Sequence, residues 1–122
     1  MTNLLVRAVR GATTVSQDDP EEIALATREL LTAIIDANKI DLDDLISVMF
    51  TTSPDLTAAF PAAAARGIGF HTVPLMCASE IAVPGAKKLC IRVMLHVYSS
   101  LSRDDIRHMY LRDAQNLRDD LR

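Results

Sequence analysis

The chain has 122 residues, the length of one ordinary domain, and a chain of this size buries enough surface to fold without disulfides or a structural metal. Its 49% hydrophobic and 24% charged residues exclude a disordered or fibrous protein. A net charge of −3 argues against nucleic acid as a partner, and no apolar run reaches the ~20 residues that span a membrane. The N-terminus lacks a signal-peptide layout. We therefore expect one domain over residues 1–122, cytoplasmic, with Cys77 and Cys90 as thiols.

The first half of the chain predicts a strand followed by a long helix. Residues 4–12 are rich in Leu and Val, which is typical of a strand. Asp19 and Pro20 then favour a helix start, and Glu22 has the spacing of a capping box. Apolar residues at helical spacing continue over residues 20–38 and form one stripe. This stripe predicts a helix that packs against a sheet.

Four further elements are expected downstream. Residues 45–51 predict a strand and residues 53–55 a turn. Residues 61–67 begin with Pro and end with Gly, as a short helix does. Residues 71–76 are a candidate third strand. The clearest strand covers residues 90–98, where apolar and mixed positions alternate.

The segment after residue 105 is ambiguous. Ile106, Met109, Tyr110 and Ala114 fit one face of a helix. Ile106, His108 and Tyr110 also fit one face of a strand. Periodicity alone leaves both possibilities open.

Arginine is the most informative residue type in this chain, which has ten Arg and three Lys. Arg92 lies in the middle of a predicted strand, where a charge is costly unless it is solvated or paired. Arg10 lies at the end of the first strand. A guanidinium grips carboxylates through two parallel donors, so both residues are candidates for binding an anionic small molecule. A solvated face or a nearby carboxylate also explains the local pattern.

Several kinds of site have no signal in the sequence. His71, His96 and His108 lack metal-ligand spacing, and Cys77 and Cys90 form no short-spaced pair. A glycine-rich phosphate loop and a recognisable nucleophile motif are also missing. These absences favour a site made of fixed positive charges and hydrogen bonds, with no metal and no cofactor.

Six segments, in this order, resemble the monofunctional trimeric chorismate mutases with a pseudo-α/β-barrel assembly. They are Val9–Val15, Ser53–Leu56, Ala59–Ala62, Cys77–Glu80, Cys90–Met94 and Ile106–Leu111. The resemblance implies an α+β fold, with a mixed five-stranded sheet packed on one long helix. It also implies a strand at 106–111 followed by a short helical turn, and a homotrimer with its sites at subunit interfaces.

The same resemblance implies a reaction and a substrate. Chorismate would rearrange to prephenate in a Claisen-type step of phenylalanine and tyrosine biosynthesis, without covalent catalysis or a cofactor. Arg92 would contact a carboxylate and the ether oxygen of chorismate, and Arg10 would hold a carboxylate. Glu80 would accept a hydrogen bond from the ring hydroxyl. Tyr110 would help to hold a carboxylate, and Cys77 would support the region around Glu80. Phe60 would form an apolar wall supplied by the neighbouring subunit. Arg66 would lie at the mouth of the pocket, and Leu117 would belong to a tail that closes over it.

One position departs from the family pattern, and other hypotheses stay open. Ala63 stands where the family often has lysine, so we expect weaker substrate capture. A non-catalytic trimer that binds a small carboxylate, or a trimeric imine hydrolase of the same architecture, would also use an interface arginine. Residues 77–80 and Tyr110 favour the mutase. A structural module built on the charged tail would not explain Arg10, Glu80 and Arg92 together.

Overall fold

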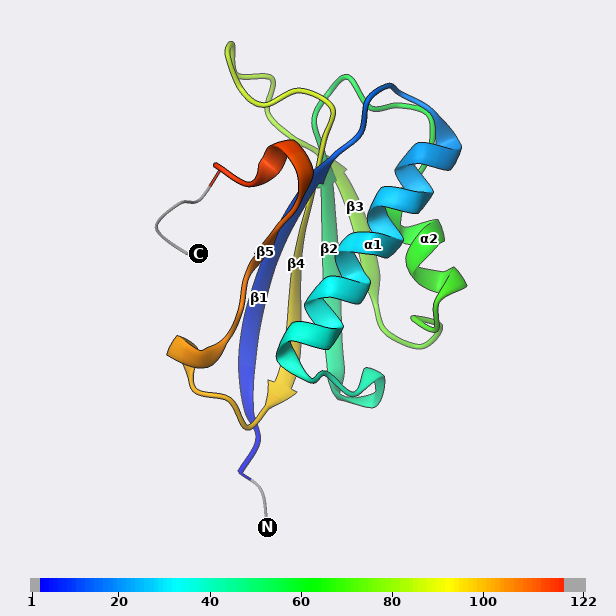
Figure 1. Ribbon diagram of the computed structural model, residues 1–122. Helices are drawn as coiled ribbons and strands as arrows, with labels where there is room; N and C mark the ends of the chain where they lie inside the picture. Colours follow the sequence, from blue (N-terminus) through cyan, green and yellow to red (C-terminus); the bar gives the residue numbers. More distant parts are fainter. Residues whose placement is uncertain (1–2, 118–122) are drawn as a thin grey trace.

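The computed structural model describes residues 3–117 (Figure 1). Its elements are β1 (Leu5–Thr14), α1 (Pro20–Asn38), β2 (Leu45–Thr52), α2 (Pro61–Gly67), β3 (Leu75–Ser79), β4 (Cys90–Ser99) and β5 (Met109–Tyr110). Short 3-10 turns lie at Leu42–Asp44, Arg103–Asp105 and Arg112–Ala114. The expected α+β class, with five strands and one long helix, is confirmed.

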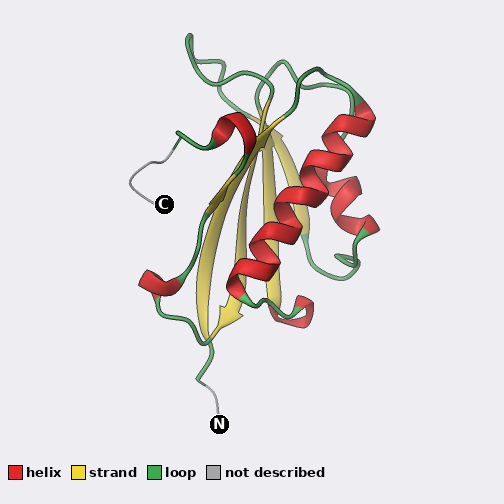
Figure 2. Ribbon diagram, viewed as in Figure 1, coloured by secondary structure: helices red, strands yellow, loops and turns green. Residues whose placement is uncertain are grey.

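The five strands form one mixed sheet in the order β3-β2-β4-β1-β5. The central strand β4 is antiparallel to both β1 and β2. The edge strands are parallel to their neighbours, β5 to β1 and β3 to β2. Both α1 and α2 cover the same face of the sheet (Figure 2). We call the opposite face, which neither helix covers, the open face.

The start and stop signals of α1 act largely as expected. The carboxylate of Asp19 accepts a hydrogen bond from the Glu22 N–H at 3.0 Å, which satisfies one of the orphan donors of the first turn. The helix ends at Asn38, and Lys39 follows in the left-handed region at φ 52°. The Asp19 bond is one half of the expected capping box, and the Glu22 carboxylate accepts from the N–H and hydroxyl of Ser16.

The hydrophobic core lies between α1 and the sheet. Its fully buried residues include Val9, Leu30, Leu31, Ile34, Val48, Phe50 and Leu95. Gly11 of β1 lies under α1 with no room for a side chain. A Cβ atom there would lie 2.8 Å from Cδ1 of Ile34 and 3.0 Å from the Met109 carbonyl oxygen, so any larger residue would force the Ile34 side chain or the β5 backbone to shift.

The third strand begins later than the sequence indicated. We expected residues 71–76, whereas β3 covers Leu75–Ser79. Pro74 has no N–H to give to a ladder, but its carbonyl accepts from the Val48 N–H at 3.0 Å, and regular pairing starts after it. Residues 77–79 lie beyond the expected strand but belong to β3, so Glu80 stands just after the strand end.

The ambiguous C-terminal segment contains a strand shorter than the resemblance implied. Of residues 106–111, only Met109–Tyr110 form a strand paired with β1, and the Leu111 N–H adds a bond to the Ala12 carbonyl oxygen at 2.9 Å. The side chain of Asn38 accepts from the Arg107 N–H at 2.7 Å and donates to its carbonyl at 2.9 Å, and so takes the place of a strand partner. The expected helical turn follows at Arg112–Ala114.

Candidate active site

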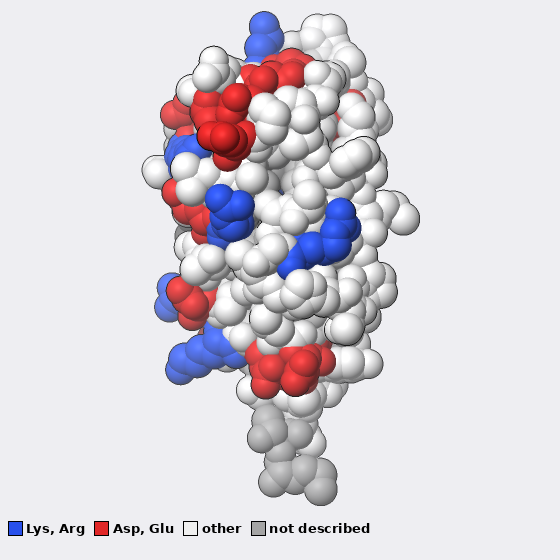
Figure 3. Space-filling view, turned by 90° about the vertical axis from the view of Figure 1, so that its right-hand side faces the viewer, with Lys and Arg blue, Asp and Glu red and all other residues white. Residues whose placement is uncertain are grey.

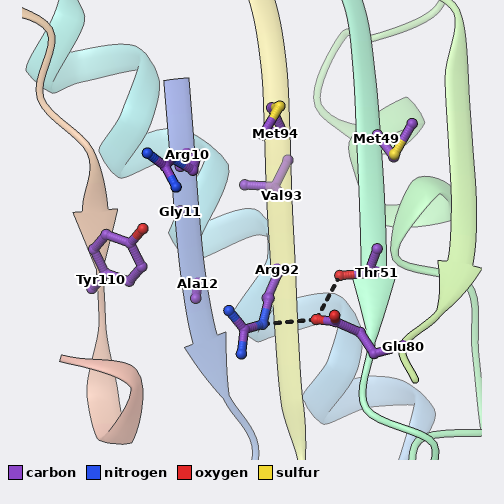
Figure 4. A pocket seen from close by; sticks show the side chains of 10 residues that line it. All are labelled: Arg10, Gly11, Ala12, Met49, Thr51, Glu80, Arg92, Val93, Met94 and Tyr110. Atoms are coloured by element: carbon purple, nitrogen blue, oxygen red, sulfur yellow. Dashed lines mark hydrogen bonds and ion pairs between the residues drawn. The ribbon is translucent and has the colours of Figure 1, made fainter. Parts of the chain in front are cut away.

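A row of paired residues crosses the open face of the sheet. Tyr110 of β5 pairs with Ala12 of β1, Ala12 with Arg92 of β4, and Arg92 with Thr51 of β2. Residues directly opposite each other in neighbouring strands point to the same side of a sheet. These four side chains therefore share the face away from α1, which lies behind the strands in Figure 4. Because Ala12 carries only a methyl group, a gap remains between Tyr110 and Arg92.

This gap belongs to a pocket of about 250 Å³. Its polar groups are Arg10, Thr51, Glu80, Arg92 and Tyr110, and the exposed Met49 and Met94 supply apolar surface. Four strands each bring one of the polar groups, and Glu80 enters directly after the fifth, β3. The strand order thus gathers residues that are up to 100 positions apart in the sequence.

Arg92 is paired and also faces the pocket. Its Nε lies 2.7 Å from Oε2 of Glu80, and the Thr51 hydroxyl donates to the same oxygen at 3.1 Å. The side chains of Arg92 and Glu80 are 40% and 35% exposed. With Nε held from one side, the two terminal nitrogens of Arg92 point toward Ala12 (Figure 4). The pairing with a carboxylate that the sequence left open is thus present, and the donor fork is still presented to the pocket.

Arg10 is the second cation of the pocket, two residues before Ala12 on the same strand face. Its backbone N–H donates to Nδ1 of His108 at 3.0 Å, just before β5 begins to pair with β1. This bond fixes the backbone beneath the Arg10 side chain. Sequence reasoning assigned no site role to His108 or Thr51. A threonine in a strand is ordinary, and the imidazole acts through a backbone contact that no motif encodes.

Cys90 lies below the pocket in a small cluster with Ala12, Tyr110 and Ala114. Burial raises the pKa of the Cys90 thiol, an effect that the positive charge of Arg92 partly opposes. A thiol with a raised pKa stays protonated near neutral pH and is a poor nucleophile. The cysteine closest to the pocket therefore serves as packing.

The other predicted site residues lie outside this pocket. Phe60 and Cys77 line a separate hollow of about 330 Å³, and the Phe60 side chain is 72% exposed. Arg66 is exposed on α2. Leu117 is partly buried and packs on the cluster that contains Tyr110. Within one chain, Arg10, Glu80, Arg92 and Tyr110 thus line one pocket, and Phe60 and Cys77 line another.

The open face has few charges and many exposed apolar side chains. These include Val6, Met49, Met76, Met94 and Tyr98. Figure 3 shows the side of the molecule that faces right in Figure 1, where the helices lie, and there both acidic and basic side chains reach the surface. No helix within residues 3–117 is long and apolar enough to cross a membrane. The same residues contain no group of three side chains able to hold a metal ion.

Comparison with known proteins identifies relatives that match almost end to end. The family described as chorismate mutase type I matches residues 6–121. Chorismate mutase AroH of Thermus thermophilus is 50% identical over 118 residues, which is 96% of this chain and 97% of that protein. Chorismate mutase AroH of Bacillus subtilis (strain 168) is 43% identical over 119 residues, covering 97% and 94%.

The structural comparison agrees. A solved chorismate mutase from Clostridium thermocellum matches with a TM-score of 0.87 and 48% identity, over 88% of this chain and 96% of that one. The resemblance drawn from six short segments is therefore confirmed. The chain belongs to the chorismate mutase type I family, isomerases that convert chorismate to prephenate in aromatic amino acid biosynthesis.

Proposed function

We propose that this chain rearranges chorismate in the pocket above Ala12, with Arg10, Glu80 and Arg92 as catalytic residues and without a cofactor. The observation that carries the proposal is the row across the open face, in which Arg92 and Tyr110 stand on either side of an alanine gap. Arg10 adds a second cation at the edge of that gap. Chorismate has two carboxylates and one ether bond that breaks, so it matches a pocket with two guanidinium groups.

Arg92 is proposed to stabilise the transition state. As the ether C–O bond stretches, negative charge builds on the oxygen, and a preplaced donor there stabilises the transition state more than the ground state. The Nε–Glu80 contact holds the guanidinium so that its terminal nitrogens face the gap. No proton transfer, nucleophile or metal is needed, because one bond breaks and another forms within a single molecule.

The other polar groups are proposed to bind chorismate in its folded, reactive shape. Arg10 and Tyr110 would hold carboxylates, which reduces the entropy that an open chain loses on reacting. Glu80 would accept a hydrogen bond from the ring hydroxyl of chorismate. Within residues 3–117, the two bonds that Glu80 makes with Arg92 and Thr51 both fall on Oε2, which leaves Oε1 for the substrate.

A homotrimer with sites at its interfaces would unite the two groups of site residues. Outside the pocket, the exposed apolar side chains of the open face support an interface between copies, since a large exposed apolar surface on a single chain marks a contact surface. The 72% exposure of Phe60 supports a role outside its own chain. We propose that a neighbouring copy supplies Phe60, Cys77 and Arg66 to the pocket, and that Leu117 closes it from the chain that carries Arg92.

The cellular location is also a proposal. Cys77 and Cys90 are both free thiols. Free thiols are typical of proteins that work in a reducing compartment. We therefore place the enzyme in the cytoplasm.

The test combines activity and mass on one sample. Purified protein is assayed for loss of chorismate absorbance with and without a chelator, and its mass is measured by sedimentation at the assay concentration. Cofactor-independent turnover by a trimer supports the proposal. Full turnover by a monomer would contradict the interface site. Release of ammonia from an imine, without loss of chorismate, would favour the related hydrolase activity instead.

A further inference from the structure

We propose that Asp18 is a positioning residue for the active site, because it holds the loop that presents Phe60. Asp18 lies between β1 and α1, and Phe60 stands at the end of the loop that joins β2 to α2. The inference rests on the proposed function, in which Phe60 forms a wall of a neighbouring copy's pocket.

The carboxylate of Asp18 gathers three donors from two consecutive residues of that loop. Its Oδ1 accepts from the N–H groups of Thr57 and Ala58, each at 3.0 Å. Its Oδ2 accepts from the Thr57 hydroxyl at 2.8 Å. Hydrogen bonds to an ionised carboxylate are stronger than those between neutral groups. The clamp therefore fixes both the position and the direction of the backbone at residues 57–58.

The carbonyl of Phe60 accepts from the Ala63 N–H of α2 at 3.1 Å, whereas the loop on its other side is held next to it by the Asp18 clamp. The Phe60 side chain is 72% exposed, so its own burial contributes little to its position. It occupies the N-cap position of α2 without a side-chain capping bond. At the far end of the loop, the Asp55 carboxylate accepts from the Leu89 N–H at 2.9 Å. The loop is thus anchored at both ends by carboxylates, and Asp18 anchors the end next to Phe60.

Asp18 has no competing role at the helix that follows it. Asp19, not Asp18, caps α1 through the Glu22 N–H. Hydrogen bonding from the Thr57 side chain lowers the pKa of Asp18, so the carboxylate is ionised near neutral pH. The residue is available for the loop alone, and losing it removes the clamp while leaving the helix cap in place.

The kinetic test compares Asp18→Ala with Asp18→Asn and a control, Asp36→Ala, which changes an exposed acid on α1. We expect Asp18→Ala to raise KM for chorismate about tenfold while kcat stays within roughly twofold, since the loss of charged hydrogen bonds misplaces a binding wall and leaves the reacting groups alone. Asp18→Asn keeps an acceptor oxygen and should give an intermediate KM. An unchanged KM in Asp18→Ala overturns the proposal.

A double-mutant cycle separates positioning from general stability. If Asp18 acts through Phe60, Asp18→Ala adds no further rise in KM to the Phe60→Ala variant. Full additivity of the two effects overturns the proposal, as does an unchanged KM in Phe60→Ala. Thermal unfolding of each variant checks that the fold is retained.

Hydrogen exchange tests the clamp without using activity. The amides of Thr57 and Ala58 should exchange faster in Asp18→Ala than in the parent chain, and equal exchange rates contradict the proposal. This result stands apart from the proposed function. An inactive parent chain would reject the proposed function, whereas an active parent with unchanged amides in the variant rejects the role of Asp18.

Discussion

Arg92 and Glu80 form an ion pair inside the pocket, with Nε 2.7 Å from Oε2. Both side chains are more than a third exposed, and such pairs contribute little to folding stability. The pair instead determines the direction of the guanidinium, because the nitrogen that Glu80 engages is the one farthest from the gap (Figure 4). We interpret Glu80 as a residue that both orients Arg92 and binds substrate.

Replacing Arg92 is the most direct test of the proposed chemistry. Arg92→Ala should lower kcat by about 10²–10³-fold or more, the loss found when one transition-state donor is removed. Arg92→Lys should be nearly as damaging, because a point charge cannot reproduce the guanidinium fork. Turnover is measured by chorismate absorbance and folding by circular dichroism. Near-normal turnover in a folded Arg92→Ala variant would refute the assigned role.

The size of residue 12 should control the capacity of the pocket. Ala12→Leu places extra methyl groups in the gap between Tyr110 and Arg92, so we expect loss of chorismate binding together with destabilisation of about 1–3 kcal/mol from overpacking. Ala12→Gly keeps the gap open and should retain binding, at a cost of about 0.5–1 kcal/mol for glycine in a strand. Inhibition by prephenate and thermal melting measure the two effects. Normal prephenate binding by Ala12→Leu would show that the gap is not the substrate pocket.

Restoring the family's lysine at position 63 should improve substrate capture. Ala63 is exposed on α2, one turn from Arg66. Ala63→Lys adds a cation at the proposed pocket rim and should lower KM roughly two- to fivefold, which corresponds to a surface interaction of up to about 1 kcal/mol. The gain should shrink as salt rises, because surface charges are screened. Ala63→Gln is the uncharged control, and an equal fall in KM there would exclude a charge effect.

A charge on the open face should break the proposed trimer. Met76 is 60% exposed on β3 and lies opposite Met49, outside the pocket, so Met76→Glu would bury a carboxylate between copies with no charged residue opposite it in its own chain. Leu25 is 55% exposed on α1, on the helix side of the sheet, so Leu25→Glu is a matched control. Sedimentation should report smaller species for Met76→Glu and the parent mass for Leu25→Glu. The opposite pattern would place the interface on the helix side.

Acid should weaken the fold through two carboxylates near the start of α1. Hydrogen bonding from the Thr57 side chain lowers the pKa of Asp18 below its ordinary 3.8, and bonding from the Ser16 side chain lowers the pKa of Glu22 below its ordinary 4.5. A depressed pKa stabilises the fold above the ordinary value, and this stability is lost as pH falls through the folded-state pKa. The unfolding free energy should therefore decrease below about pH 4.5, as measured by denaturant titration. Asp18→Asn should have a shallower acid slope, and an unchanged slope would contradict this assignment.

The sequence predicted an element correctly where a single local effect, such as helix capping or strand alternation, determines it. Asp19 and Pro20 predicted the start of α1 because capping is decided within one turn. Alternation predicted β4 because one of its faces is core and the other is open. The limits of β3 were wrong because the parallel pairing with β2 depends on the carbonyl of Pro74, which sequence periodicity does not reveal.

The site was predicted in part, for a similar reason. The pattern identified Arg10 and Arg92 as unusual charges, but only the strand order brings them to one pocket. Thr51 and His108 were missed because their roles depend on partners in other strands, Glu80 and the Arg10 backbone. The roles of Phe60, Cys77, Arg66 and Leu117 came from the family resemblance and remain predictions.

The tight contact at Gly11 has a consequence for engineering. Gly11 touches α1 on one side of the sheet, and its immediate neighbours Arg10 and Ala12 form the pocket on the other side. A repacked helix that presses on β1 would shift those neighbours as well. Stabilising substitutions at Leu30 or Ile34 should therefore be screened for catalysis, because residues 10–12 link the position of α1 to the spacing of the charges in the proposed substrate pocket.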